Sequence, residues 1–496
     1  MSSRIYANLG FLLQIAGLLT ILPIAVGLYF EETQAVVSLF IACVTFLGCG
    51  FLLNALCERK DLDFKSSNML FLASFIVLPL IGALPFIYSD PFSSANAYER
   101  FTNGIFESVS GFTTTGFSFV TNPDTLAKSL LVYRSITELM GGVGIVFLLV
   151  AFFQSKKKSM ETYGNSIGVE NVNGDLKKTF LSVFAIYGGY IIAFTVIFFA
   201  LGFTNLIGTG TFMIDTITGG FQPTDQQFQQ YLSFAPKIFL IVLMLLGSLN
   251  FAFSYHLFTR KPKKAFSWEI VAFFLIILLG TVSFSLLGNY SAVDSLFHVV
   301  SMSSSTGFNF IPLASLSSTL LSILIVLMLI GGCTFSMAGG IRVSRLIASA
   351  KSVKESVKSV LIKENVIPAE EQHPLMENNS NGNREYLSAP IIILLFALVL
   401  VVFAVIFTTI GVSFTDALFE VGSALTTNGI SMGATNVLMP IGYKWLMIAA
   451  MTIGRVEILS ILIALSTYKL TKSNEAGAGW LHRARKQRSE QQSRVS

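Results

Sequence analysis

The hydrophobic residues of this chain fall in long blocks rather than at the spacing of an amphipathic helix. A helix needs roughly 20 apolar residues to cross the hydrocarbon core of a bilayer. The blocks that reach this length predict ten transmembrane helices. They are residues 9–30, 35–57, 68–88, 130–154, 180–202, 235–258, 268–288, 319–347, 388–411 and 443–469.

Composition supports a membrane protein. The 496 residues are 53% hydrophobic and 12% charged, whereas a soluble domain has about 25% charged residues. These values exclude a soluble globular enzyme and a disordered protein. Four cysteines are too few for a disulfide framework.

The basic residues predict the orientation of the spans. They gather after every second predicted span, in segments 59–65, 156–178, 260–264, 351–363 and 483–494. Basic loops remain on the cytoplasmic side, so both termini are expected in the cytoplasm. A basic tail that binds nucleic acid is disfavoured, because the tail shares its charge bias with four other segments.

The segments on the opposite, outer side contain a repeated motif. Its full copies are residues 106–117, 297–308 and 419–430, and a partial copy is 215–221. Each full copy has a glycine ten residues after a phenylalanine, with small hydroxyl or amide residues before the glycine. Three residues before the phenylalanine stand Asn103, Asp294 and Asp416, which are typical N-cap residues.

Each copy lies between two predicted spans, so the unit is span, short re-entrant helix, glycine-containing stretch and span, four times. A short helix that enters from outside points its negative dipole end at the membrane centre, which favours a cation there. Carbonyl oxygens around a glycine turn can replace the water shell of that cation. The fold class predicted is an all-α polytopic membrane protein with ten transmembrane helices, four re-entrant pore helices and a pseudo-fourfold channel-like pore.

The candidate ion-binding residues are the last three residues of each motif copy up to and including its glycine, and they would bind a cation. They are Thr114, Thr115, Gly116, Thr218, Gly219, Gly220, Ser305, Thr306, Gly307, Thr427, Asn428 and Gly429. Oxygen ligands suit hard cations. Gly116, Gly220, Gly307 and Gly429 are expected to form the narrowest ring, with Gly219 as the alternative to Gly220 in the second copy.

The eighth span is interrupted by glycines and hydroxyl residues. Close helix packing is one explanation, and an unwound segment lining a cavity is another. The second explanation predicts a gate at Gly331, Gly332, Cys333, Thr334, Phe335, Ser336, Gly339 and Gly340.

Arg455 lies inside the tenth span, where a charge costs at least about 2.5–3.5 kcal/mol and normally faces the bundle interior. It could pair with a carboxylate such as Glu138 or Glu457. Alternatively, it could place a fixed positive charge beside the gate.

These motifs resemble those of the Trk/Ktr/HKT potassium-transporter superfamily, and the two extra N-terminal spans resemble the TrkH-type ion-translocating subunit. The motifs are 114–117, 218–221, 305–308, 331–342, 454–457 and, in the sixth span, 248–253. The fourth copy departs from the family because Ile430 replaces the phenylalanine after the glycine.

The resemblance implies potassium uptake across the cytoplasmic (inner) membrane, one filter glycine per repeat, a gate in the third repeat and Arg455 beside it. It also implies a homodimer and a cytosolic regulatory subunit that binds nucleotides. The sequence contains no dinucleotide fingerprint or phosphate-binding loop, so no cofactor is expected in this chain. Potassium ions and membrane lipid are the other expected partners, and nucleic acid is not expected.

The repeats predict a division of the chain into two extra helices, four pore repeats and a basic tail. The boundaries are 1–66, 67–178, 179–264, 265–386, 387–472 and 473–496. An alternative function is a sodium- or proton-coupled potassium symporter or a K⁺/Na⁺ transporter of the same superfamily. An intramembrane enzyme is disfavoured, because the sequence lacks an HExxH motif, a Cys/His cluster and paired carboxylates on one span.

Overall fold

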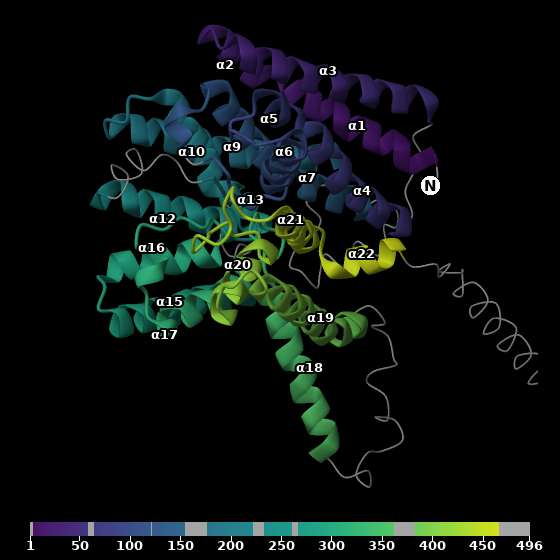
Figure 1. Ribbon diagram of the computed structural model, residues 1–496. Helices are drawn as coiled ribbons and strands as arrows, with labels where there is room; N and C mark the ends of the chain where they lie inside the picture. Colours follow the sequence, from purple (N-terminus) through teal and green to yellow (C-terminus); the bar gives the residue numbers. More distant parts are fainter. Residues whose placement is uncertain are drawn as a thin grey trace, which may run out of the picture.

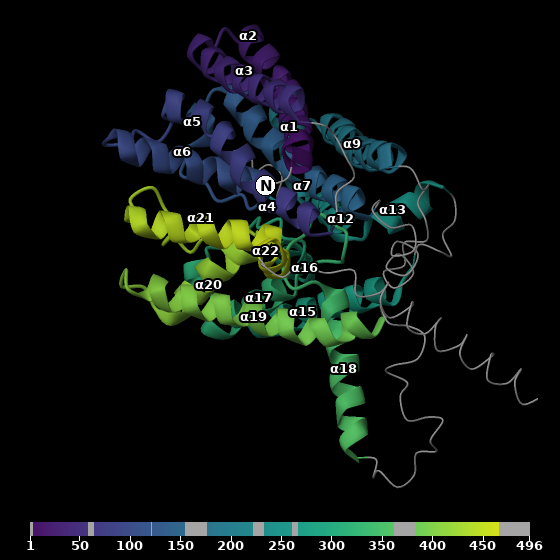
Figure 2. The same cartoon turned by 90° about the vertical axis from the view of Figure 1, so that its right-hand side faces the viewer.

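The computed structural model describes residues 3–57, 64–120, 122–153, 176–221, 233–259, 266–361 and 382–465. Across those ranges the regular structure is helical, and no strand is formed. Most helices lie side by side in one body, from which a single helix projects (Figures 1 and 2). The predicted all-α class is therefore confirmed.

Three helices precede the repeats, namely α1 (Ser3–Leu19), α2 (Ile21–Tyr29) and α3 (Thr33–Leu56). They lie at one edge of the body, where they are purple in Figure 1. The Glu32 carboxylate, between α2 and α3, accepts hydrogen bonds from the backbone N–H groups of Lys128 and Ser129 at 2.7 and 2.9 Å. These residues begin α7 (Lys128–Phe153), so Glu32 caps that helix.

Each of the four repeats contains a short helix between longer apolar ones. The short helices, called pore helices below, are α6 (Ala97–Phe112), α10 (Leu206–Thr218), α16 (Ala292–Ser303) and α20 (Phe414–Leu425). Before them lie α4 (Phe64–Gly82) with α5 (Leu84–Ser89), α9 (Leu176–Ala200), α15 (Trp268–Gly288) and α19 (Gly382–Thr408). After them lie α7, α12 (Phe234–Ser248) with α13 (Phe251–Phe258), α17 (Ser318–Ile330), and α21 (Ile441–Val456) with α22 (Ile458–Leu465).

Six helical stretches among the described residues are long and apolar enough to cross a membrane. Two further candidates are bent pairs, α12 with α13 at 108° and α21 with α22 at 90°. Every predicted span contains helix in its described part, including α7 and the shorter α17. The chain is a multi-pass membrane protein, and the total of ten spans stays a prediction.

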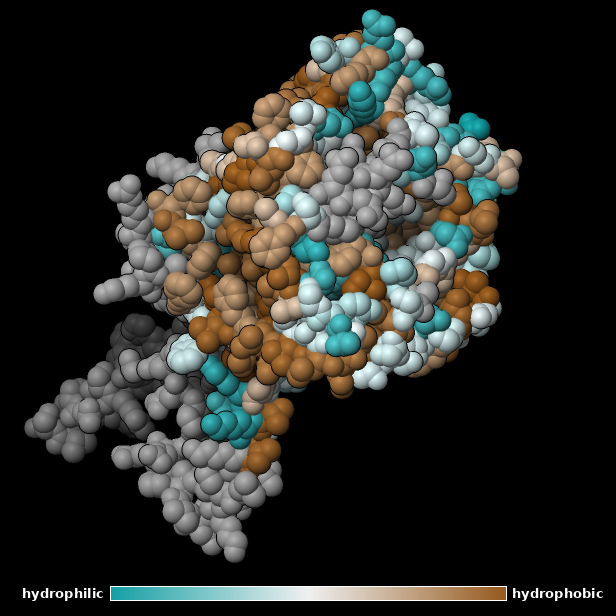
Figure 3. Space-filling view, turned by 90° about the vertical axis from the view of Figure 1, so that its left-hand side faces the viewer, coloured by the Kyte–Doolittle hydropathy of each residue, from teal (hydrophilic) through white to brown (hydrophobic). Residues whose placement is uncertain are grey.

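The surface has the apolar character that contact with lipid requires. Brown, hydrophobic residues cover much of the face in Figure 3. Large apolar side chains are exposed along the long helices, such as Ile192 at 67%, Leu279 at 59% and Leu394 at 66%. In water such a surface would be unfavourable, whereas in a bilayer it is solvated by acyl chains.

The pore helices begin earlier than the sequence predicts. Their N-caps are Asn96, Asn205, Ser291 and Ser413, whose side chains accept hydrogen bonds from backbone N–H groups three residues later. The prediction of N-caps at Asn103, Asp294 and Asp416 is therefore wrong. The two aspartates occupy the first helical turn instead, where a negative charge interacts favourably with the helix dipole.

Candidate ion pathway

The predicted ion-binding residues follow the C-terminal ends of the pore helices and are almost fully buried. We call these segments the pore loops: residues 113–117, 218–221, 304–308 and 426–430. The predicted ion-binding residues that carry side chains are at most 2% exposed; they are Thr114, Thr115, Thr218, Ser305, Thr306, Thr427 and Asn428.

Three pore loops share one backbone conformation. Thr114, Ser305 and Thr427 have φ of +55°, +59° and +53°. Two residues later the glycines Gly116, Gly307 and Gly429 have φ of +86°, +74° and +73°. The residue between each pair keeps a negative φ. Alternation between positive and negative φ turns successive backbone dipoles to the same side of the loop.

The four pore loops form a closed ring, in which each glycine lies against the backbone of the next loop. A Cβ atom added to Gly116 would lie 2.4 Å from the carbonyl carbon of Gly220, and one on Gly219 would lie 2.4 Å from the Ser305 oxygen. The corresponding distances are 1.9 Å from Gly307 to the Asn428 oxygen and 1.8 Å from Gly429 to the Thr115 oxygen. The first loop therefore contacts the second, the second the third, the third the fourth, and the fourth the first.

The second loop differs from the others by one residue. Its positive φ, +91°, belongs to Gly219 rather than Gly220. A Cβ on Gly220 would instead lie 2.1 Å from a carboxylate oxygen of Glu138, which belongs to α7 of the first repeat. The two positions therefore require glycine for different reasons. Gly219 lets the second loop contact the third, and Gly220 leaves room for the Glu138 carboxylate.

The predicted gate residues form a non-helical segment between α17 and α18 (Val343–Leu361), which we call the break segment, residues 331–342. It is hydrogen-bonded to the bend between α12 and α13. The N–H groups of Cys333 and Met337 donate to the carbonyls of Ser248 and Gly247 at 3.0 and 3.1 Å, and Phe251 donates to the Phe335 carbonyl at 3.0 Å. The broken helix therefore supplies the carbonyls that satisfy the break segment.

The break segment also touches the ring. The Gly339 N–H donates to the Ser305 hydroxyl at 3.0 Å. A Cβ on Gly339 would lie 2.3 Å from the Thr426 carbonyl oxygen. The hydroxyls of Thr334 and Ser336 bond within the protein, to Ser344 and to the Cys333 carbonyl.

Arg455 is 4% exposed and lies beside the break segment. Its guanidinium donates to the Met337 carbonyl at 3.1 Å and to the Gly141 carbonyl at 3.2 Å. Among the described residues Glu138 forms no ion pair with it. Glu138 instead accepts from the Phe221 N–H at 3.0 Å and the Thr218 hydroxyl at 3.2 Å.

Glu457, which follows α21, binds two arginines: Arg342 at the end of the break segment and Arg345 in the first turn of α18. Arg342 lies 3.0 Å from one carboxylate oxygen, and Arg345 contacts the other. The sequence prediction missed both arginines, although Arg342 closes the motif 331–342. They fasten the break segment to the bend between α21 and α22.

Parts of the predicted basic segments lie outside the described residues. The basic segment 156–175 and the tail from 466 are not described.

The described residues contain no group of three or more His, Cys, Asp or Glu side chains able to hold a metal. The pore loops themselves offer backbone carbonyls, hydroxyls and one amide, and the Glu138 carboxylate lies against the second loop. Such oxygen atoms suit hard cations.

The helices, the apolar surface and the ring of pore loops define a polytopic membrane protein with a channel-like, pseudo-fourfold architecture. The model of the TrkH family, described as cation transport protein, matches residues 33–274 and 269–474. The chain therefore belongs to the TrkH family of cation transport proteins.

Similar proteins cover nearly the whole chain. An uncharacterized cation transporter of Methanocaldococcus jannaschii is 27% identical, over 92% of this chain and 94% of its own length. The Trk system potassium uptake protein TrkH of Halomonas elongata is 26% identical, over 92% and 96%. The crystal structure of the potassium transporter TrkH from Vibrio parahaemolyticus superposes with a TM-score of 0.78, covering 94% of this chain and 98% of that one at 24% identity. This likeness confirms the fold.

Proposed function

We propose that this chain takes up potassium across the cytoplasmic membrane, and that the four pore loops form its selectivity filter. The closed ring of pore loops carries the proposal, because it brings four sets of carbonyl and hydroxyl oxygens to one place at the ends of four pore helices. The relatives of Halomonas elongata and Escherichia coli are named potassium uptake proteins, which supports potassium as the ion. Inward movement of one charge gains about 2.3 kcal/mol per 100 mV of membrane potential.

The break segment is the gate in this proposal. It lies against the third and fourth pore loops through Gly339, and its glycines permit rearrangement at small steric cost. Arg455 holds the Met337 carbonyl and so keeps the segment in place. Its positive charge also disfavours a cation waiting beside the gate.

Replacing Gly307 by serine tests the filter. The purified chain and the variant are reconstituted in liposomes, and uptake of rubidium and of sodium is measured separately. A side chain at Gly307 would meet the Asn428 carbonyl, so the variant is expected to lose its preference for rubidium. Unchanged selectivity in a conducting variant would contradict the filter assignment.

Coupled transport is the alternative for the same pore. Rubidium uptake is measured with and without an imposed sodium or proton gradient, at constant membrane potential. Uncoupled conduction predicts equal rates. Uptake that requires either gradient would establish the coupled symporter instead.

The expected assembly follows from the same proposal. The chain forms a homodimer in the inner membrane with both termini in the cytoplasm, and a cytosolic nucleotide-binding subunit regulates it. The projecting helix α18 carries Lys351 and Lys354 away from the body (Figures 1 and 2), and it offers a docking element for that subunit. Light scattering of the purified chain tests the dimer.

A further inference from the structure

One position on the pore helices carries a polar side chain that holds the extended segment leaving the pore loop. It is the residue after the motif phenylalanine, occupied by Glu107, His298 and Glu420 in repeats one, three and four. All three side chains are fully buried. None of them was assigned a role from the sequence.

The three side chains accept the same backbone hydrogen bond. The donor is the N–H group twelve residues further on, at Phe119, Phe310 and Met432. The distances are 3.0 Å to Glu107, 3.5 Å to Nε2 of His298 and 2.8 Å to Glu420. Nδ1 of His298 lies 2.8 Å from the Asp294 carbonyl, which assigns the ring proton to Nδ1 and leaves Nε2 as the acceptor.

The second repeat has a buried acceptor from another repeat, which binds the loop at a different place, directly after Gly220. Met213 occupies the equivalent position and cannot accept a backbone hydrogen bond of comparable strength. Glu138 of the first repeat accepts instead from the Phe221 N–H, and the absent side chain of Gly220 makes room for it. Three loops are thus held at the third residue after the glycine, and the second loop is held at the first residue after Gly220.

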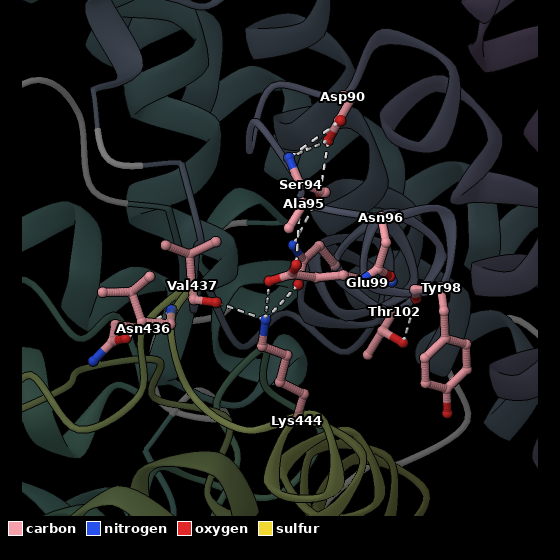
Figure 4. A network of polar contacts seen from close by, with 12 residues as sticks. Asp90, Ser94, Ala95, Asn96, Tyr98, Glu99, Thr102, Asn436, Val437 and Lys444 are labelled. Atoms are coloured by element: carbon pink, nitrogen blue, oxygen red, sulfur yellow. Dashed lines mark hydrogen bonds and ion pairs between the residues drawn. The ribbon is translucent and has the colours of Figure 1, made fainter.

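Repeats one and three have an additional contact from the preceding repeat. Lys444 of repeat four lies 5.0 Å from the centre of the Phe119 ring, and Lys237 of repeat two lies 4.6 Å from that of Phe310. Each ammonium group also binds the next pore helix, at Asn103 (2.8 Å) or Asp294 (2.5 Å). Figure 4 shows Lys444 reaching between Glu99 and the Val437 carbonyl.

Removing an acceptor would leave the backbone N–H group without this partner, which costs free energy. The segment after the pore loop would then shift to find another partner, and the adjoining carbonyls would move with it. We propose that Glu107, Glu138, His298 and Glu420 are positioning residues that fix the width of the filter and thereby its choice of ion. This inference rests on the proposed function of the pore loops.

Two glutamine variants compare an acceptor that glutamine can replace with one that it cannot. Glu420 receives three donors on one oxygen, from Ser431, Met432 and Ala434, and only the Thr435 hydroxyl on the other. A glutamine fits, since the Thr435 hydroxyl can turn and accept. Glu107 receives the Ser118 hydroxyl and Arg134 on one oxygen and the Phe119 N–H on the other. A glutamine at position 107 would place its NH₂ group against a donor, whichever of the two carboxylate oxygens it replaces.

The experiment measures the ratio of rubidium to sodium uptake in liposomes for Glu107→Gln, Glu420→Gln and Glu420→Ala. The ratio does not depend on the amount of folded protein. We expect Glu420→Gln to stay within about twofold of the parent, and the other two variants to lose at least about fivefold of the ratio. If Glu420→Ala does not fold, the two glutamine variants still give the comparison.

An unchanged ratio in Glu107→Gln and Glu420→Ala would overturn the positioning role. An equal loss in both glutamine variants would also overturn it, because it would assign the effect to charge rather than to geometry. A parent chain that conducts without preferring rubidium would instead refute the proposed function itself.

Discussion

At the scale of single residues, the ring of pore loops depends on hydrogen atoms where other residues carry a Cβ. Gly429 combines a left-handed φ of +73° with the Thr115 carbonyl in the place of its missing side chain. Gly433, four residues later, has a φ of +107°, but no atom lies within 4 Å of the place that a Cβ would occupy. The two glycines thus separate backbone strain from steric contact.

Replacing Gly429 by alanine is expected to lower the rubidium-to-sodium uptake ratio at least about tenfold, which is about 1.4 kcal/mol of discrimination. The added carbon would displace the first pore loop. Gly433→Ala is the control, because it carries the strain without the contact and should keep the ratio. Equal behaviour of the two variants would show that the ring contact does not set selectivity.

The sequence predicted the residues of the ring but not its supports. The glycines and the small residues before them repeat at a fixed spacing, so that alignment of the copies found them. Glu107 and Glu420 also occupy the same position in their copies of the motif. A carboxylate beside a proposed filter indicates an ion ligand, however, and does not indicate an acceptor for a backbone hydrogen bond. Its acceptor role depends on an N–H group twelve residues away, which only the folded chain reveals.

At the scale of elements, three of the four repeats contain an interrupted helix. The helix after the pore helix breaks in the second, third and fourth repeats, after Ser248, Ile330 and Val456. The sequence predicted only the break after Ile330, where four glycines lie close together. At the other two breaks one glycine is followed by polar or charged residues within an apolar run, and that pattern is also compatible with a straight helix.

Replacing Arg455 by methionine is expected to increase rubidium uptake by up to about tenfold. The variant keeps most of the side-chain volume but loses both donors to Met337 and Gly141, and hydrogen bonds from charged groups contribute about 1.5–3 kcal/mol. The break segment should then leave the pathway more readily. Uptake is measured per folded protein in liposomes.

Arg100→Ala is the matching control, because Arg100 is half-exposed and pairs only with Asp90 among the ion pairs of the described residues. It should leave uptake unchanged. A fall in the uptake of a well-folded Arg455→Met variant would argue that the arginine supports conduction rather than closure.

At the scale of the whole molecule, the N-terminal helices are joined to the first repeat by specific contacts. Glu32 caps α7 with two backbone N–H groups and the Ser129 hydroxyl, and the Lys128 ammonium lies 3.9 Å from the centre of the Phe30 ring. Hydropathy predicted these helices but could not predict their attachment, which depends on a residue 96 positions from its partner.

Glu32→Ala is expected to destabilise the chain by about 1 kcal/mol, the usual cost of losing a helix cap. The thermal unfolding midpoint in detergent should fall, and the ion selectivity should stay the same because Glu32 touches no pore loop. Glu32→Gln keeps one accepting oxygen and should fall in between. A selectivity change in Glu32→Ala would mean that the N-terminal helices influence the filter.

The closed ring has a consequence for how such a protein can change over generations. In a channel assembled from four identical subunits, one altered codon changes every quarter of the pore at once. Here the quarters are encoded separately, so that Asn428 can stand where the first and third loops have Thr115 and Thr306, and the second loop can be offset by one residue. Ion preference can therefore change in small steps on which selection acts separately, and each step alters the contacts of one neighbouring quarter.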